Sequence, residues 1–83
     1  MTQKKAIVPK DTWSNPALSA GIRTGDLLFV SGQIAMDRSG QLVGVGNCEV
    51  QTRQVMINLQ SVIEAAGGTM DNVVKITCFL TNV

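Results

Sequence analysis

The chain has 83 residues, of which 45% are hydrophobic, and its seven basic and six acidic side chains give a net charge of +1. A chain of this length forms at most one small domain with a thin stability margin. No run of basic residues marks a surface for nucleic acid, and no apolar stretch approaches the roughly 18 residues that span a bilayer. The first ten residues lack the apolar segment of a secretory signal. We therefore expect a cytoplasmic domain with neither nucleic acid nor a membrane as its partner.

The chain contains two cysteines and no histidine. Cys48 and Cys78 lack the close spacing of a zinc site, so we expect neither a metal nor another cofactor. Both lie on apolar faces of predicted elements, where a free thiol packs as a small hydrophobic group. Because histidine is absent, Ser–His and Cys–His nucleophile pairs are excluded within this chain.

The first half of the chain predicts short extended segments separated by turns. The sequence KKAIV predicts a strand that Pro9 ends, because proline cannot donate to a strand ladder. Residues 11–25 are typical of a loop, with a short strand around residues 18–22. The clearest strand pattern follows over residues 24–36, opened by a turn at Thr24-Gly25-Asp26. Residues 37–40 predict another turn, and an irregular link follows.

The strand pattern LLFVSGQIAM has two mostly apolar faces and a glycine near its centre. One face holds Leu28, Val30, Gly32, Ile34 and Met36, and the other holds Leu27, Phe29, Ser31, Gln33 and Ala35. Glycine weakens a strand and often marks a close approach of other atoms. Two interpretations of Gly32 remain open, which are packing of a helix against the sheet and approach of a ligand.

From Asn47 the hydrophobic period becomes helical. Asn47 is the expected N-cap, and Gly67 and Gly68 are the expected stop. The more distant Arg53, Gln60 and Glu64 are expected on a solvated face. The expected apolar stripe consists of Cys48, Thr52, Val55, Met56, Leu59, Val62, Ile63 and Ala66.

The segment VVKITCFLT, residues 73–81, predicts a strand in the same sheet as residues 24–36. The helix between the two strands is expected to cover one face of that sheet. Leu27, Phe29 and Phe79 then remain on the uncovered face. An exposed apolar face of this kind predicts a partner, either further chain or identical subunits.

Three motifs in order resemble the Rid family of reactive intermediate deaminases, formerly called YjgF. They are SGQI at residues 31–34, QTRQ with VIEAAGGTMD along the helix and its cap, and VVKITCFLT after it. The resemblance covers essentially the whole chain. It implies an α+β fold of the chorismate-mutase-like type, with helices packed on one face of a β-sheet. Residues 1–83 would then be a single Rid-like domain that lacks its C-terminal part.

The resemblance also implies a homotrimer whose clefts between subunits bind a small-molecule substrate. The implied activity is hydrolysis of enamines or imines, such as 2-aminoacrylate and 2-iminopropanoate, to a 2-oxo acid and ammonia. The arginine, cysteine and glutamate of the family's site would lie beyond position 83, so the catalytic residues within this chain are unknown. Matching positions give Ser31 and Gly32 as substrate-binding residues, and Leu18 stands where many members carry a pocket tyrosine.

Other roles for these residues are also open. Ser31 could instead be hydrogen-bonded to a neighbouring strand. Cys78 is a weak candidate nucleophile, because it is expected on the side facing the helix. Arg53, on a solvated face, and Arg23, in a loop, are weak candidates for the missing carboxylate ligand. The alternative function is a non-catalytic module that binds a small carboxylate or assembles as a trimer, while RNA cleavage fits the charge and the few aromatic residues poorly.

Overall fold

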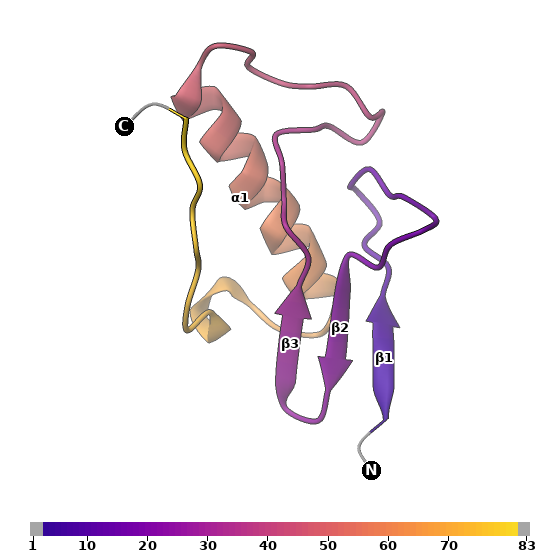
Figure 1. The fold of residues 1–83 in the computed structure, drawn as a ribbon. Coiled ribbons are helices and arrows are strands. Elements are labelled where there is room, and N and C mark those ends of the chain that lie inside the picture. Colours follow the sequence, from indigo (N-terminus) through magenta and orange to yellow (C-terminus); the bar gives the residue numbers. More distant parts are fainter. Residues whose placement is uncertain (1–2, 82–83) are drawn as a thin grey trace.

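A computed structural model describes residues 3–81 of the chain as three short strands followed by one long helix (Figure 1). Within the described part, no helix combines the length and hydrophobicity that crossing a bilayer requires. The elements in chain order are β1 (Lys4–Ile7), β2 (Gly21–Thr24), β3 (Leu27–Val30), α1 (Cys48–Ala65) and the 3-10 turn η1 (Met70–Asn72).

The three strands form an antiparallel sheet in the order β1-β2-β3. Thr24 pairs with Leu27, so β2 and β3 are joined by a hairpin whose loop is Gly25 and Asp26. Gly25 has a φ of 58°, which a glycine adopts at the first central position of such a turn without steric cost. The predicted turn at residues 24–26 is therefore confirmed. The strand predicted at residues 18–22 is displaced to β2.

Both predicted ends of the helix are confirmed. The Asn47 side chain accepts a hydrogen bond from the backbone N–H of Val50 at 3.1 Å, as an N-cap does. At the other end Gly67 has a φ of 89°. The N–H groups of Gly67 and Gly68 donate to the carbonyls of Glu64 and Ile63, which is the hydrogen-bond pattern of a Schellman stop.

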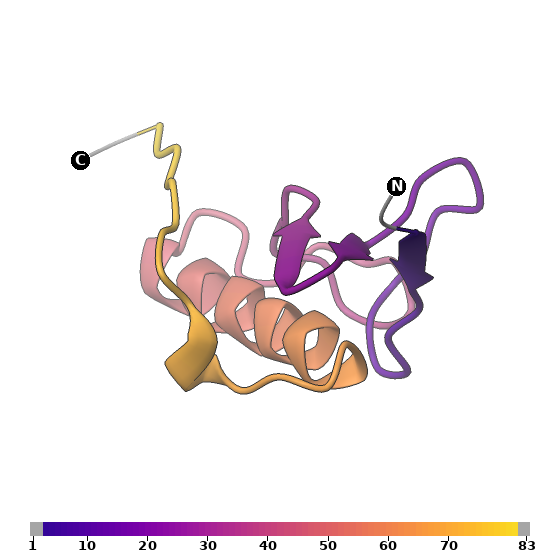
Figure 2. The same ribbon diagram turned by 90° about the horizontal axis from the view of Figure 1, so that it is seen from below.

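The helix packs on one face of the sheet, as Figure 2 shows from below. Val62 is fully buried there, and Ile63 is 5% exposed. A Cβ added at Gly21 on β2 would lie 3.1 Å from Cγ1 of Val62. A glycine thus does allow the helix to approach the sheet, but it is Gly21 and not Gly32. The predicted α+β architecture is confirmed.

The predicted long strand over residues 24–36 is wrong in its length, because β3 ends at Val30. Val30 pairs with Gly21, the first residue of β2, so the ladder ends where its partner strand ends. Past this point the chain is held by other contacts, including an isolated bridge between Met36 and Leu42. The turn predicted at residues 37–40 is confirmed, since the Asp37 carboxylate accepts from two backbone N–H groups that follow it.

The predicted strand at residues 73–81 is also wrong for the residues that the structure describes. Residues 73–80 follow η1 without any assigned strand, and Figure 1 shows them in yellow as a separate trace that does not join the sheet. Strand propensity reflects packing against neighbouring strands, and none lies beside this segment. Val74 and Phe79 are 97% and 93% exposed as a result.

Both cysteines were predicted to be buried, and both are exposed. Cys48 lies in the first turn of α1, beyond the part of the helix that reaches the sheet. Cys78 lies in the exposed segment that pairs with no strand. The helix therefore uses only the C-terminal half of its predicted stripe to form the core.

The chain exposes more surface than a compact protein of its size. Its accessible surface is 6660 Å², whereas a compact monomer of this mass exposes about 4,800 Å². Leu27 and Phe29, predicted on the uncovered face, are each 61% exposed. The expectation of an uncovered apolar face is confirmed for these two residues, and Phe79 is exposed on its unpaired segment.

Candidate functional site

The candidate site lies where the chain leaves β3. The N–H of Ser31 donates to the carbonyl oxygen of Ala20 at 2.9 Å, and the Ser31 hydroxyl donates to the carbonyl oxygen of Ser19. These two bonds bring residues 31–32 beside the loop that contains Leu18, which is 71% exposed. Ser31 and Gly32 are adjacent here, and Leu18 precedes the two residues that bind Ser31, which leaves substrate binding by these three residues a prediction.

The Ser31 hydroxyl makes a structural contact, as in the alternative to a binding role, but with the loop before β2 and not with a neighbouring strand. Its proton is engaged by the Ser19 carbonyl. A hydroxyl oxygen can still accept hydrogen bonds while it donates one, and Ser31 is exposed. The contact therefore fixes the direction of the hydroxyl and leaves its acceptor side toward solvent.

Gly32 faces open space. A Cβ added there would meet no atom within 4 Å, and its φ lies outside the left-handed region. Neither helix packing nor backbone strain requires glycine at this position within the chain. The helix-packing interpretation of Gly32 is wrong, and the close approach of a ligand or of another subunit remains.

The downstream end of the same segment is held by Asn58 of α1. Its Nδ2 donates to the carbonyl oxygens of Ile34 at 3.1 Å and Met36 at 2.9 Å. Its Oδ1 accepts from Nε2 of Gln54 at 2.9 Å. Sequence reasoning missed this residue, although a polar side chain three and four positions from apolar Val55 and Val62 was a visible signal.

The arginines of the chain are engaged away from Ser31. Nη1 of Arg23 donates to the carbonyl oxygen of Ala66 at 2.9 Å, at the C-terminus of α1. Arg23 lies in β2, so its predicted loop position is wrong. Arg53 forms an ion pair with Glu49 on the solvated face of α1, as expected for that face.

The remaining arginine, Arg38, lies 3.7 Å from a carboxylate oxygen of Asp11. In the part of the chain that the structure describes, no arginine therefore offers a free guanidinium group beside Ser31. The described residues also hold no cluster of three metal-ligating side chains. Cys78 lies on the exposed segment and not against the helix. The prediction that Cys78 faces the helix, which made it a weak candidate nucleophile, is therefore wrong.

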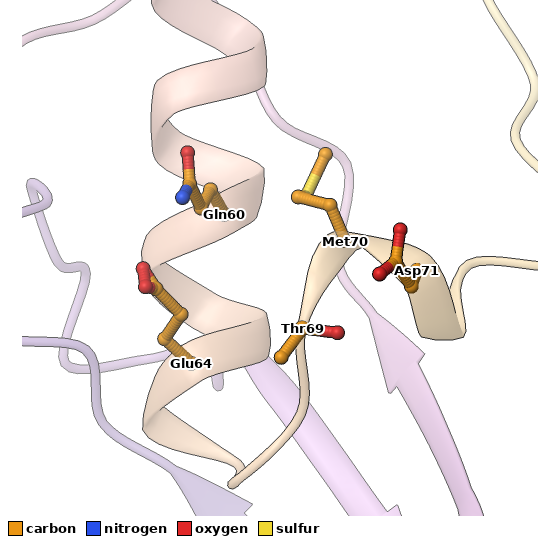
Figure 3. Close-up of a pocket in the computed structure, with 5 residues that line it drawn as sticks. All are labelled: Gln60, Glu64, Thr69, Met70 and Asp71. Carbon is orange, nitrogen blue, oxygen red and sulfur yellow. The ribbon is translucent and has the colours of Figure 1, made fainter.

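Two hollows lie elsewhere, along α1. One, of about 280 Å³, is lined by Gln60, Glu64, Thr69, Met70 and Asp71, between the helix and η1 (Figure 3). A larger one of about 680 Å³ shares Gln60 and Glu64 and extends to Val8, Lys10 and Asp11. Neither is lined by Leu18, Ser31 or Gly32, and the only charged groups of the first are two carboxylates. These two hollows therefore do not belong to a site at Ser31.

Comparisons with known proteins agree with this architecture. The family model described as Endoribonuclease L-PSP matches residues 6–83. A RutC family protein of Pyrococcus horikoshii is 41% identical over 63 residues, which are 75% of this chain and 49% of that protein. The crystal structure of a candidate endoribonuclease L-PSP from Entamoeba histolytica has a TM-score of 0.76 and 34% identity, covering 83% of this chain and 56% of that one.

The chain spans about half the length of the curated relative and of the solved structure that it matches. Proteins of this family are generally oligomeric, which is consistent with the exposed apolar face of the sheet. The match to the family model extends over the strands, the helix and residues 73–83. The chain therefore belongs to the endoribonuclease L-PSP family, the YjgF or Rid family that its motifs resemble.

Proposed function

We propose that this protein hydrolyses reactive imines and enamines of small 2-amino acids, of the 2-iminopropanoate and 2-aminoacrylate type, in the cytoplasm. The observation that supports the proposal best is the open, exposed backbone at Gly32, next to the Ser31 hydroxyl that the Ser19 carbonyl fixes. Membership of the Rid family supports the reaction type. The charge of +1 and the absence of histidine favour a small substrate over RNA.

The reaction makes modest demands on the protein. Water adds to the electrophilic imine carbon and forms a C–O bond, and the C–N bond then breaks. The nitrogen leaves as ammonia, and the carbon becomes the carbonyl of the 2-oxo acid. Because the carbon is already electrophilic, orientation of the substrate and water supplies much of the effect. Ser31 can accept a hydrogen bond from the imine N–H or the water, while Gly32 leaves room for the substrate.

The carboxylate of such a substrate requires a cation, and no hydrogen bond or ion pair of the described residues places one at Ser31. A bidentate arginine is the group best suited to this contact, but Arg23, Arg38 and Arg53 are engaged elsewhere. The site is therefore proposed to lie in a cleft between subunits, where another subunit or further chain supplies the cation. The exposed Leu27 and Phe29 support an assembly through the sheet face, for which we propose a homotrimer.

A non-catalytic carboxylate-binding module is the second candidate. The observation in its favour is that the Ser31 hydroxyl is engaged by the Ser19 carbonyl and that the chain has no histidine to act as a general base. Such a module would be stabilised by a small 2-oxo acid but would release no ammonia. RNA cleavage is the activity in the descriptions of the matching family and of the Entamoeba protein, and for this chain it is an outcome to be tested.

The test generates 2-iminopropanoate in solution with an amino-acid oxidase and follows its loss, with and without the purified protein. Faster loss of the imine with equivalent 2-oxo acid and ammonia supports the proposed hydrolysis. Thermal stabilisation by pyruvate without faster loss of the imine would support the binding module instead. Cleavage of an unstructured RNA would contradict the proposed substrate class, provided that the cleavage persists in the presence of nuclease inhibitors and is lost when Ser31 is replaced.

A further inference from the structure

We propose that Asn58 is a positioning residue, which fixes the backbone of residues 31–36 and so orients Ser31 and Gly32 in the site. This inference rests on the proposed function for its catalytic consequence. Its structural part depends only on the contacts of Asn58. No atom of Asn58 is proposed to touch the substrate.

Asn58 is a polar side chain at a core position. It is 4% exposed, and it lies on the face of α1 that buries Val62 and Ile63. A buried amide contributes little to hydrophobic stabilisation and is costly unless its hydrogen bonds are made. Asparagine is also a poorer helix former than leucine. A leucine at this position would therefore serve α1 better, unless the amide has a task outside the helix.

The contacts of Asn58 show what that task is. Both bonds from Nδ2 go to backbone carbonyls of one short segment, those of Ile34 and Met36. The N–H of Met36 also donates to the Ile34 carbonyl at 2.8 Å, so the chain turns tightly at Ala35, and the one amide holds the carbonyls at both ends of this turn. The N–H of Val43 donates to the intervening carbonyl of Ala35 at 2.8 Å. Asn58 is thus the side chain that fastens this segment to the helix.

The position of this anchor along the chain connects it to the site. Ser31 is fixed by its two bonds to Ser19 and Ala20, and Ile34 is fixed by Asn58. Only Gly32 and Gln33 lie between the two anchors, and glycine has the largest conformational freedom of any residue. With both ends fixed, the Gly32 backbone is held in one conformation. With only the Ser31 end fixed, the Gly32 backbone can adopt several conformations.

Gln54 completes the arrangement one turn earlier in the helix. Its Nε2 donates to Oδ1 of Asn58 at 2.9 Å. This bond occupies the oxygen of the amide and so directs the nitrogen toward the two carbonyls, because a flipped amide would place two donors against each other. Gln54 itself contacts no atom of residues 31–36 among the hydrogen bonds of the described chain.

The experiment compares Asn58→Leu with a matched control, Val62→Ala, in the complete oligomeric protein. Val62→Ala weakens the same contact between helix and sheet without touching the carbonyls of residues 34 and 36. Hydrogen exchange is measured at the N–H groups of Met36 and Val43, at denaturant concentrations that match the global stabilities. We expect these amides to exchange about tenfold faster in Asn58→Leu than in Val62→Ala, with equal rates in α1. Equal rates at all sites would overturn the positioning role.

The catalytic part is read on the same samples. We expect kcat/KM for 2-iminopropanoate to fall about tenfold in Asn58→Leu and to change little in Val62→Ala, because misplacement of a site segment costs activity that a general loss of stability does not. Faster exchange of these amides in Asn58→Leu together with an unchanged kcat/KM would overturn the proposal that Asn58 orients the site. Inactivity of the unaltered protein would refute the proposed function alone, and hydrogen exchange would then decide the positioning role.

A milder variant serves if Asn58→Leu does not fold. Asn58→Ser keeps one donor of smaller reach, and it is expected to increase exchange at Met36 and Val43 relative to Val62→Ala. Unchanged exchange at these two amides in a folded Asn58→Ser protein would equally overturn the proposal.

Discussion

The guanidinium of Arg23 on β2 donates from Nη1 to the carbonyl oxygen of Ala66, the C-cap of α1, at 2.9 Å. This bond joins the middle of the sheet to the end of the helix that packs on it. The last carbonyls of a helix carry partial negative charge and lack partners within the helix. Arg23 thus has a structural task, which accounts for its absence from the candidate substrate site.

Replacement of Arg23 tests this task. Arg23→Gln is expected to lower the free energy of unfolding by about 1 kcal/mol, the usual net worth of a hydrogen bond, reduced here by solvent exposure of the side chain. Chemical denaturation at low ionic strength measures the effect. Arg53→Gln is the matched control, because its exposed pair with Glu49 is worth about 0.3–0.5 kcal/mol. Equal losses in the two variants would contradict the role of Arg23 at the helix end.

The two glycines of the sheet region are expected to respond oppositely to an added methyl group. In Gly21→Ala the new Cβ would lie 3.1 Å from Val62 and 3.3 Å from the carbonyl oxygen of Phe29, so we expect a loss of about 1–3 kcal/mol from overpacking. In Gly32→Ala the new Cβ meets open space, and stability is expected to be unchanged or slightly higher. Urea unfolding of both variants provides the comparison. A large loss in Gly32→Ala would show an unseen contact of the chain with itself.

The exposed face of the sheet is expected to hold the oligomer together. Leu27→Lys with Phe29→Lys places two charges on that face and should dissociate the protein, because a buried charge without a partner is costly. Light scattering measures the mass, and circular dichroism checks that the helix remains. Ile57→Lys is the control, since Ile57 is 53% exposed on the helix. An unchanged mass in the double variant would place the subunit contact elsewhere.

The Ser31 hydroxyl is expected to serve both structure and site. Ser31→Ala removes its bond to the Ser19 carbonyl and should cost about 1 kcal/mol of stability. It should also lower kcat/KM for 2-iminopropanoate several-fold, about 1 kcal/mol in transition-state binding. Ser14→Ala, at an exposed serine of the loop before β2, is the control. A stability loss with unaltered kinetics would leave Ser31 with its structural contact alone.

Local signals in the sequence predicted most of the fold. The cap at Asn47, the stop at Gly67 and the turn at Gly25 each depend on one residue type in one backbone conformation, and all three are confirmed. The wrong predictions concern residues whose structure depends on a partner. The segment at residues 73–81 has the composition of a strand, but no strand lies beside its described residues, and composition does not specify a partner.

The candidate site could be predicted only in part for the same reason. Alternation and the family motifs indicated Ser31 and Gly32, and the structure binds Ser31 to Ser19 and Ala20 in the loop that follows Leu18. Alternation also predicted that Gly32 faces the helix, yet the strand ends at Val30, so the pattern no longer applies at position 32. Asn58 was overlooked because the helical stripe was traced through apolar residues.

The most direct test of the account is the activity of Gly32→Val toward 2-iminopropanoate, at an oligomeric state and stability matched to the unaltered protein. A Cβ at residue 32 would meet no atom within 4 Å, so the branched side chain is expected to occupy this open space. If substrate approaches the backbone there, kcat/KM should fall by more than about tenfold, since the approach is blocked at a residue that orients the substrate. Unchanged imine hydrolysis by the well-folded oligomer would contradict a site at Ser31 and Gly32.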